Sequence, residues 1–228
     1  MLSFLRANTP DTLGSLLKLD ICFDLYADKT NDNWLVELGK TQQQAGFEAI
    51  LNVAHNMNVE SIRSPNLPLP LHVVPLVGIK KDAASEIPNI QKTKQSQTYV
   101  FIETNRQCAG GELEDVIFRL ELQGYLPILT QADRYTCLQD NYRNAKRLID
   151  RGCLLHTNLL SLTGHQGTTG KRLAEKLLTD GLVSFFGTGI ASNEGLQLVK
   201  SFKGTRKLLR VLANNPIKNS ELLASSTL

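Results

Sequence analysis

Histidine is scarce in this sequence, with four residues among 228, and long hydrophobic runs are missing. No apolar stretch approaches the about 20 residues that a membrane-spanning helix needs. The longest apolar runs, such as 181–186, have the length of a β-strand. Residues 1–11 contain neither a long apolar segment nor a small-residue cleavage pattern. We therefore expect a protein with no membrane span and no signal peptide.

Paired cysteines and a dominant charge are also lacking. Cys22, Cys108, Cys137 and Cys153 are widely spaced and form no CxxC pair, which excludes zinc-knuckle and thiol–disulfide redox motifs. Reduced thiols in a cytoplasmic protein are the expected state. The formal net charge is only +3, with both signs interspersed and no basic stripe. Nucleic-acid binding is therefore not expected.

The sequence does contain a regular alternation of short apolar runs with longer segments of helical period. Short apolar or period-2 runs predict β-strands, whereas apolar residues spaced three and four apart predict helices. Seven strands are predicted, at Leu19–Leu25, Ala49–Ala54, Leu71–Val77, Thr98–Glu103, Leu126–Thr130, Cys153–Leu159 and Leu182–Thr188. Helices are predicted at Asn33–Ala45, Ala83–Pro88, Glu112–Gln123, Asn141–Arg151, Gly170–Thr179, Asn193–Phe202 and Thr205–Leu212, and in a short terminal segment after Asn214.

Glycines mark the ends of several of these helices. Gly46, Gly124, Gly152 and Gly181 each come just after a segment of helical period. Glycine is favoured there because the residue that ends a helix often adopts a left-handed backbone conformation.

A strict order of strand, helix, strand predicts an α/β fold with a parallel sheet and helices outside it. About seven repeats, without a glycine-rich dinucleotide fingerprint after the first strand, favour a closed barrel over an open sheet. We expect one barrel over residues 19–223, an N-terminal extension at 1–18 and a frayed tail at 224–228. In such a barrel, functional residues project from the C-terminal ends of the strands.

Two stretches after the fourth strand resemble a known family. They are GYLPILTQADRY at 124–135 and RGCLLHTNLLSLTG at 151–164. Both are similar to bacterial tyrosine phosphatases that control capsular and extracellular polysaccharide, within the polymerase and histidinol phosphatase (PHP) superfamily. The resemblance extends over most of the chain and implies a single distorted seven-stranded parallel β/α barrel.

The resemblance also implies a site of three divalent ions, usually manganese, which make a hydroxide that attacks phosphotyrosine. Two family ligand positions are kept in type here. The histidine of the second strand end falls on His55, and the glutamate of the fourth falls on Glu103. The arginine of the family motif His-Pro-Glu-Arg-Tyr falls on Arg134.

Most of the other ligand positions are changed. The opening His-x-His of the family falls on Cys22 and Asp24, and the histidine of His-Pro-Glu-Arg-Tyr falls on Gln131. The glutamate after the third strand falls within 76–78, where no side chain can bind a metal, and the closing Asp-x-His falls on Gly189-Ile-Ala191. Asp24 retains some capacity to bind a metal.

Three ions cannot be assembled from these ligands, because each needs several hard N or O donors. We therefore expect a catalytically degenerate member with a regulatory or binding role in capsular or exopolysaccharide synthesis and no cofactor. The alternative is an active metal-dependent tyrosine phosphatase with a reduced or altered site. That site would hold manganese or another divalent ion on Asp24, His55 and Glu103.

Individual side chains also have alternative roles. His55 makes an ordinary hydrogen bond or binds a metal, and Glu103 pairs with Arg134 or a lysine, or binds a metal. Arg134 either contacts a phosphate or another anion, which a guanidinium can do without metal, or forms a structural ion pair. His72 and His156, within predicted strands, are expected to be packed in the interior.

The resemblance suggests partners as well. A tyrosine autokinase of polysaccharide export is one, and an active paralogue in a mixed oligomer is another. A homo-oligomer is a further expectation, and the expected location is the cytoplasm.

Overall fold

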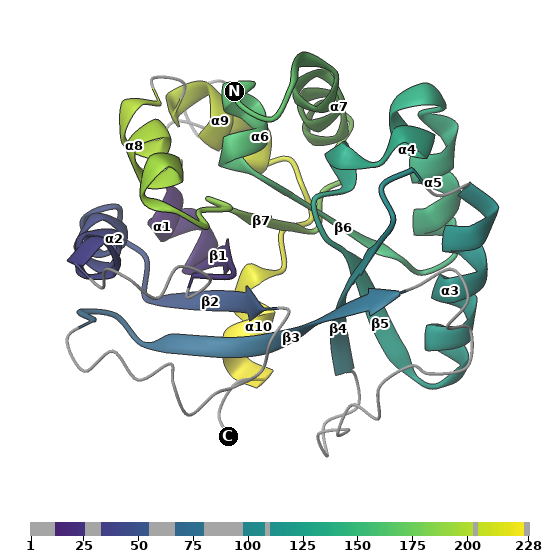
Figure 1. Ribbon diagram of the computed structural model, residues 1–228, viewed down its shortest axis with the longest axis horizontal. Coiled ribbons are helices and arrows are strands. Elements are labelled where there is room, and N and C mark those ends of the chain that lie inside the picture. Colours follow the sequence, from purple (N-terminus) through teal and green to yellow (C-terminus); the bar gives the residue numbers. More distant parts are fainter. Residues whose placement is uncertain are drawn as a thin grey trace, which may run out of the picture.

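The computed structural model describes residues 12–25, 33–54, 67–79, 98–107, 110–202 and 205–225. Seven parallel strands are hydrogen-bonded in chain order, each to the next (Figure 1). The strands are β1 (Leu19–Phe23), β2 (Ala49–Ala54), β3 (Leu71–Ile79), β4 (Thr98–Thr104), β5 (Tyr125–Leu129), β6 (Leu154–Asn158) and β7 (Phe185–Gly187). The seven predicted strands are thus confirmed in number and order, although several of their bounds differ.

The largest difference is at β7, which the sequence predicts to begin at Leu182. The backbone N–H of Leu182 instead donates to the carbonyl of Leu177 (3.0 Å). The next N–H, of Val183, donates to the side-chain oxygen of Asn215 (3.1 Å). These donors are used outside the sheet, so regular strand pairing starts only later.

Strand β3 changes partner along its length. Residues 71–75 pair with β2, whereas residues 76–79 pair with β4. The two neighbours therefore flank different halves of the same strand. This stagger is the kind that a curved, barrel-like sheet requires.

Helices cover the outer face of the sheet, with α3, α4 and α5 together on one side and α2 on the other (Figure 1). The predicted helices within the described residues are confirmed. The prediction for Ala83–Pro88 lies outside them. The observed long helices are α2 (Asn33–Gln44), α3 (Gly110–Leu122), α5 (Arg143–Asp150), α7 (Thr168–Thr179), α8 (Asn193–Ser201), α9 (Thr205–Leu212) and α10 (Asn219–Ser225).

Four short helical turns are not predicted from the sequence. They are α1 (Leu13–Leu17), the 3-10 turn η3 (Ala132–Arg134), α4 (Thr136–Asp140) and α6 (Leu159–Thr163). Segments of three to five residues are too short to show a helical period. The predicted glycine caps are correct, with φ of 84° at Gly46, 80° at Gly124, 82° at Gly152 and 71° at Gly181.

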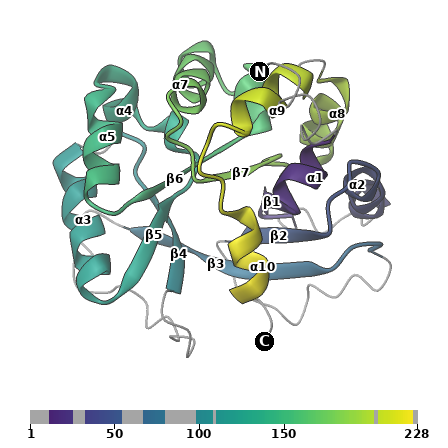
Figure 2. The same ribbon diagram turned by 180° about the vertical axis from the view of Figure 1, so that it is seen from behind.

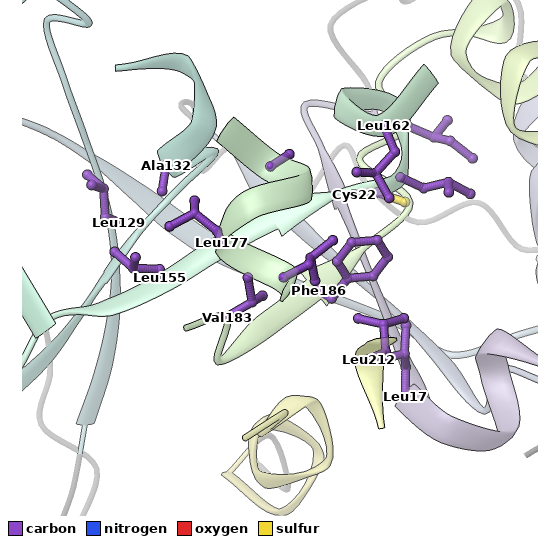
Figure 3. Packing of buried hydrophobic residues seen from close by; sticks show 14 of the residues in the cluster. Leu17, Cys22, Leu129, Ala132, Leu155, Leu162, Leu177, Val183, Phe186 and Leu212 are labelled. Atoms are coloured by element: carbon purple, nitrogen blue, oxygen red, sulfur yellow. The ribbon is translucent and has the colours of Figure 1, made fainter. Parts of the chain in front are cut away.

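Alternate residues of the strands face two separate hydrophobic layers. The layer beneath the helices contains Cys22, Leu155 and Phe186 from the strands and Leu177 from α7 (Figure 3). The layer on the interior face contains Leu19, Ile21, Phe23, Leu51, Phe101, Ile128 and Phe185, together with Leu222 of α10. This alternation decides which polar residues of each strand face the interior.

The junction between the first and last strands differs from the expected closed barrel. No strand ladder between β1 and β7 is present in the described parts of the chain. The two edges are joined by single backbone bonds, from Gly189 N–H to the carbonyl of Ile21 (3.1 Å) and from Phe23 N–H to that of Ile190 (3.1 Å). We call this junction, of residues 19–23 with 185–190, the β1–β7 seam.

Helix α10 lies in front of the sheet in Figure 2 and contacts β1. Its Asn219 side chain is fully buried. The carboxamide accepts from Phe186 N–H (3.1 Å) and donates to the carbonyls of Leu19 (2.9 Å) and Phe186. One side chain thus supplies hydrogen bonds to both edges where a ladder is missing.

Among the helices that the structure describes, none is long and apolar enough to cross a lipid bilayer.

Candidate functional site

The C-terminal ends of the strands form one rim, and most of the predicted site residues lie along it. Asp24 follows β1, Glu103 lies near the end of β4, and Arg134 ends the η3 turn after β5. All three side chains are partly exposed. His55, the predicted ligand after β2, lies outside the described residues.

The backbone at two of these positions is in the left-handed region. Asp24 has φ of 45° and Gln131 has φ of 47°. Non-glycine residues adopt this conformation rarely, and such strain is concentrated at functional sites. The resemblance predicts both as family ligand positions, whereas Lys18, with φ of 62°, is not among the predicted site residues.

Cys22 is turned away from the interior and lies beneath the helices. Its thiol donates to Asp20 Oδ2 (3.3 Å) and lies 3.6 Å from Thr188 Oγ1. Burial, together with the neighbouring Asp20, raises the pKa of the Cys22 thiol well above its usual value. The thiolate that a soft metal would need is therefore disfavoured here.

Asp20 organises this buried cluster, although the sequence analysis does not single it out. Its carboxylate accepts from Thr188 N–H (2.7 Å) and Thr188 Oγ1 (2.8 Å), and also from the amide of Gln42 on α2. Burial raises the pKa of Asp20, and the hydrogen bonds from Thr188 oppose that rise. Asp20 is the one charged residue in an otherwise apolar strand, and this was the signal in the sequence that could have pointed to the cluster. The cluster lies across the β1–β7 seam and stabilises it.

The resemblance predicts the family's closing aspartate at Gly189, where a side chain would clash with the carboxamide of Asn158. A Cβ built on Gly189 would lie 2.7 Å from Nδ2 of Asn158 and closer still to its Cγ. The backbone φ is +74°, which L-residues with side chains adopt at a cost. Ala191, at the position of the closing histidine, is exposed.

Arg134 lies in a mixed electrostatic environment on the rim. Its guanidinium donates to the side-chain oxygen of Gln131. Burial lowers the pKa of Arg134, and repulsion from Arg106 lowers it further, whereas attraction to Asp133 and Glu103 opposes this. Glu103 is therefore close enough to Arg134 to interact with it, as the ion-pair alternative requires.

Hydrogen bonds to Asp133 hold the η3 turn that carries Arg134. Thr157 Oγ1 donates to Asp133 Oδ1 (2.6 Å), and the amide of Gln139 donates to the Asp133 carbonyl (2.8 Å). Burial raises the pKa of Asp133, partly offset by hydrogen bonds from Thr157 and Ser161. These contacts hold Arg134 in place relative to β6.

His156 is fully buried, which confirms the prediction of a packed histidine, whereas His72 is only partly buried. Nδ1 of His156 accepts from Gln131 N–H (3.2 Å), and its ring packs edge-on against Phe23 at 5.3 Å between centroids. Burial lowers the pKa of His156 to about 3. The imidazole is therefore neutral near pH 7.

A cluster of three manganese ions does not fit the described donors. Within the described ranges, no group of three or more His, Cys, Asp or Glu side chains is placed to hold an ion. Asp24 and Glu103 are hard donors at predicted ligand positions, but Cys22 is committed to a buried cluster and a side chain at position 189 would clash with Asn158. We therefore assign no catalytic step to a metal.

The chain is an α/β protein with a parallel sheet, and its candidate site residues lie at the C-terminal ends of the strands. Residues 40–197 match the family described as capsular polysaccharide synthesis, CpsB/CapC. The match covers more than half of the chain, and the protein belongs to this family. No curated protein matches the chain.

A solved structure is similar over most of the fold. It comes from a study of YwqE from Bacillus subtilis and CpsB from Streptococcus pneumoniae, described as unique metal-dependent tyrosine phosphatases. The identity is 18% and the TM-score is 0.57, with 88% of this chain and 96% of that chain covered. At this identity the likeness shows a shared fold.

Proposed function

We propose that this protein is a catalytically degenerate member of the CpsB/CapC family with a regulatory or binding role in capsular or exopolysaccharide synthesis. The observation that carries the proposal is the packing at Gly189, where a Cβ would lie 2.7 Å from the Asn158 amide nitrogen. An aspartate ligand cannot stand there without moving Asn158, which caps α6 by accepting from Ser161 N–H.

The state of Cys22 also supports the proposal. Its thiol is wholly buried and bonded to Asp20, so position 22 offers no ligand to the rim. The backbone of Asp24 and Gln131 is in the left-handed region, which is frequent at functional sites. In this proposal the scaffold of a site is present, although several of its ligand positions carry no metal donor.

The role that we propose is recognition without hydrolysis. Arg134, partly exposed on the rim, retains the chemistry for contact with a phosphate, because a guanidinium binds two oxygens at once. The proposed partner is the tyrosine autokinase of polysaccharide export in the cytoplasm, or an active paralogue in a mixed oligomer. We further propose that the β1–β7 seam closes the sheet into one distorted barrel over residues 19–223.

The direct test is a phosphatase assay on protein loaded with manganese, with an aryl phosphate and a phosphotyrosine peptide as substrates. We expect no hydrolysis above a Glu103→Ala control and less than one transition metal bound per chain by elemental analysis. Hydrolysis that Glu103→Ala abolishes, with stoichiometric metal, would overturn the proposal. That result would favour the alternative, an active phosphatase with a reduced site on Asp24, His55 and Glu103.

A pull-down tests the partner independently. Immobilised protein should retain the tyrosine-rich tail of a polysaccharide-export kinase, and phosphorylation of the tail should strengthen retention through Arg134. An Arg134→Gln variant should lose the phosphorylation-dependent part. Equal retention by both proteins would argue against a phosphate contact at this residue.

A further inference from the structure

Charge is unevenly distributed along the C-terminal part of the chain. Residues 195–220 contain six lysine and arginine residues and no aspartate or glutamate. The whole chain has a formal net charge of only +3, so the remainder of the sequence is acidic overall. The mixture of signs that is seen over most of the sequence therefore does not extend to this segment.

Three of these cations lie together on α9. Arg206, Lys207 and Arg210 are all exposed. Position 210 is a neighbour of both others on the helix surface, because it follows them by four and three residues. The three positions span only about 6 Å along the helix axis. The leucines of α9 are buried against the body of the protein, so the helix presents a compact cationic face to solvent.

The cationic face of α9 is not neutralised from within the described parts of the chain, where none of its three side chains forms an ion pair. Two other cations of the segment differ in this respect. Lys200 pairs with Glu37 of α2, and Lys218 pairs with Glu221 (3.5 Å). Like charges three and four residues apart on a helix repel each other, and a bound anionic partner would relieve that repulsion.

The cationic face of α9 belongs to the end of the sheet opposite the rim. Helix α9 contacts α1 and α7 (Figure 2), and α1 leads directly into the start of β1. Just after α9, Asn215 accepts from the N–H of Val183 (3.1 Å), which precedes β7. The starts of parallel strands lie at the opposite end from the strand ends that carry the candidate site. Binding at α9 is therefore independent of the chemistry of the rim.

The character of α9 distinguishes between three classes of anionic partner. A helix binds a membrane surface by inserting an apolar face, but the leucines of α9 are buried. Nucleic-acid binding commonly uses about 6–10 phosphate contacts or aromatic side chains that stack on bases. Helix α9 has three exposed cations and no aromatic residue. A short run of carboxylates matches a face of this size.

We infer that the cationic face of α9, formed by Arg206, Lys207 and Arg210, is a docking surface for an acidic segment of another polypeptide. The two guanidinium groups can each bind a carboxylate through two parallel hydrogen bonds, and the lysine supplies a third positive charge. The partner segment carries several aspartate or glutamate residues close together. This surface provides an interaction beyond the one proposed for the rim.

The test uses a fluorescein-labelled oligoglutamate peptide, with oligoglutamine of the same length as the neutral control. Binding to the full chain is followed by fluorescence anisotropy in low-salt buffer. We expect saturable binding of oligoglutamate and none of oligoglutamine. The binding should be lost at high salt, because the Debye length falls from about 10 Å at 0.1 M to about 3 Å at 1 M.

The decisive variant combines Arg206→Gln, Lys207→Gln and Arg210→Gln. Glutamine has a helix propensity close to that of lysine and arginine, and all three positions are exposed, so the fold should be kept. An exposed ion pair contributes up to about fivefold in affinity, and the triple variant should therefore bind oligoglutamate at least about tenfold more weakly. Arg210→Gln alone should weaken binding several-fold.

A second triple variant is the matched control. It combines Lys40→Gln on α2 with Arg143→Gln and Lys146→Gln on α5, all at exposed positions. It removes the same total charge but leaves α9 intact. Its affinity for oligoglutamate should equal that of the wild type.

Equal affinity in the wild type and the α9 variant would overturn the inference, as would equal weakening in the two triple variants. Tighter binding of a DNA duplex or of phosphatidylglycerol vesicles at the same ionic strength would also overturn it, by identifying another class of partner. A dimer in sedimentation that only the α9 variant loses would do so as well, since the occupant would be a second copy. The manganese assay is separate, because the α9 variant keeps Glu103 and Arg134. Hydrolysis there would overturn the proposed function and leave docking at α9 intact.

Discussion

Replacing Asn219 by alanine should destabilise the protein mainly at the β1–β7 seam. The side chain makes three hydrogen bonds, one from Phe186 N–H and one each to the carbonyls of Leu19 and Phe186. Each contributes about 1 kcal/mol net, and the Phe186 N–H left unpaired in the interior adds about 1–3 kcal/mol. The expected loss is about 4–6 kcal/mol.

Thermal unfolding followed by circular dichroism measures this loss. Domains of this size lose about 2–4 °C in Tm for each kcal/mol, so Asn219→Ala should lower Tm by about 10 °C. Since native proteins are stable by about 5–15 kcal/mol, the variant should still fold at low temperature. Its local effects can then be read in the native state.

Asn215→Ala is the matched control. Asn215 is also buried and also makes three hydrogen bonds, with Val183 N–H and with the carbonyls of Leu178 and Val211. None of these partners is on β1, so a similar loss of stability is expected without an effect on the seam.

Hydrogen exchange separates the two variants. The amides of Phe23 and Gly189 donate across the seam, and their protection reports its opening. Asn219→Ala should speed exchange at these amides well beyond the change caused by Asn215→Ala. The same exchange rates in both variants, or a Tm change near zero in Asn219→Ala, would refute the view that this side chain joins the two edges.

Three further predictions follow from the buried polar groups and the glycines. Burial raises the pKa of Asp20, so its contribution to folding is present below its unfolded pKa and is lost as pH rises through the folded one. The free energy of unfolding, compared with Asp20→Asn, should fall as the pH rises above about 4; a rise in chemical-denaturation experiments would contradict this. Gly189→Ala should cost more than Gly164→Ala, because both have positive φ but a Cβ at position 164 meets only Cδ of the Lys171 side chain, at 3.4 Å. A positive φ alone costs about 1–2 kcal/mol, and equal losses in urea titrations would show that the carboxamide beside position 189 yields freely. Native Cys22, buried and with a raised pKa, should resist iodoacetamide, whereas the partly exposed Cys137 reacts. Mass spectrometry of the alkylated protein decides this, and rapid labelling of Cys22 would be the contrary result.

The order of strands and long helices could be predicted from the sequence because it depends on local periodicity. Strand Ala49–Ala54 and helix Thr205–Leu212 were predicted with their observed bounds. The start of β7 was not, because the N–H of Val183 is taken by Asn215, which lies 32 residues away. A contact of that range leaves no local pattern.

The seam could not be predicted for the same reason. Asp20 and Thr188 are separated by 168 residues, and Asn219 and Leu19 by 200. Single polar residues in apolar surroundings were visible in the sequence, but their partners were not. The expected closed barrel requires β1 and β7 to pair along a regular ladder of hydrogen bonds. That expectation came from the number of strands, which does not show which backbone groups of the two edge strands pair.

The candidate site was predicted only in part. Arg134, Glu103 and Asp24 lie on the rim where strand ends were expected to carry function. The burial of His156 was predicted, but its proton position was not, because it depends on a backbone N–H from Gln131, a residue that follows a different strand. Side-chain identity alone does not fix which nitrogen is a donor.

The position of Asn219 after the last strand has a consequence for biosynthesis. The side chain that bridges the first and last strands leaves the ribosome only after these seven strands have been made. Until then the edges of β1 and β7 lack this bridge, and open edges pair readily with other chains. Messages truncated before codon 219 should therefore yield products that aggregate or depend on chaperones, even though every strand is already present.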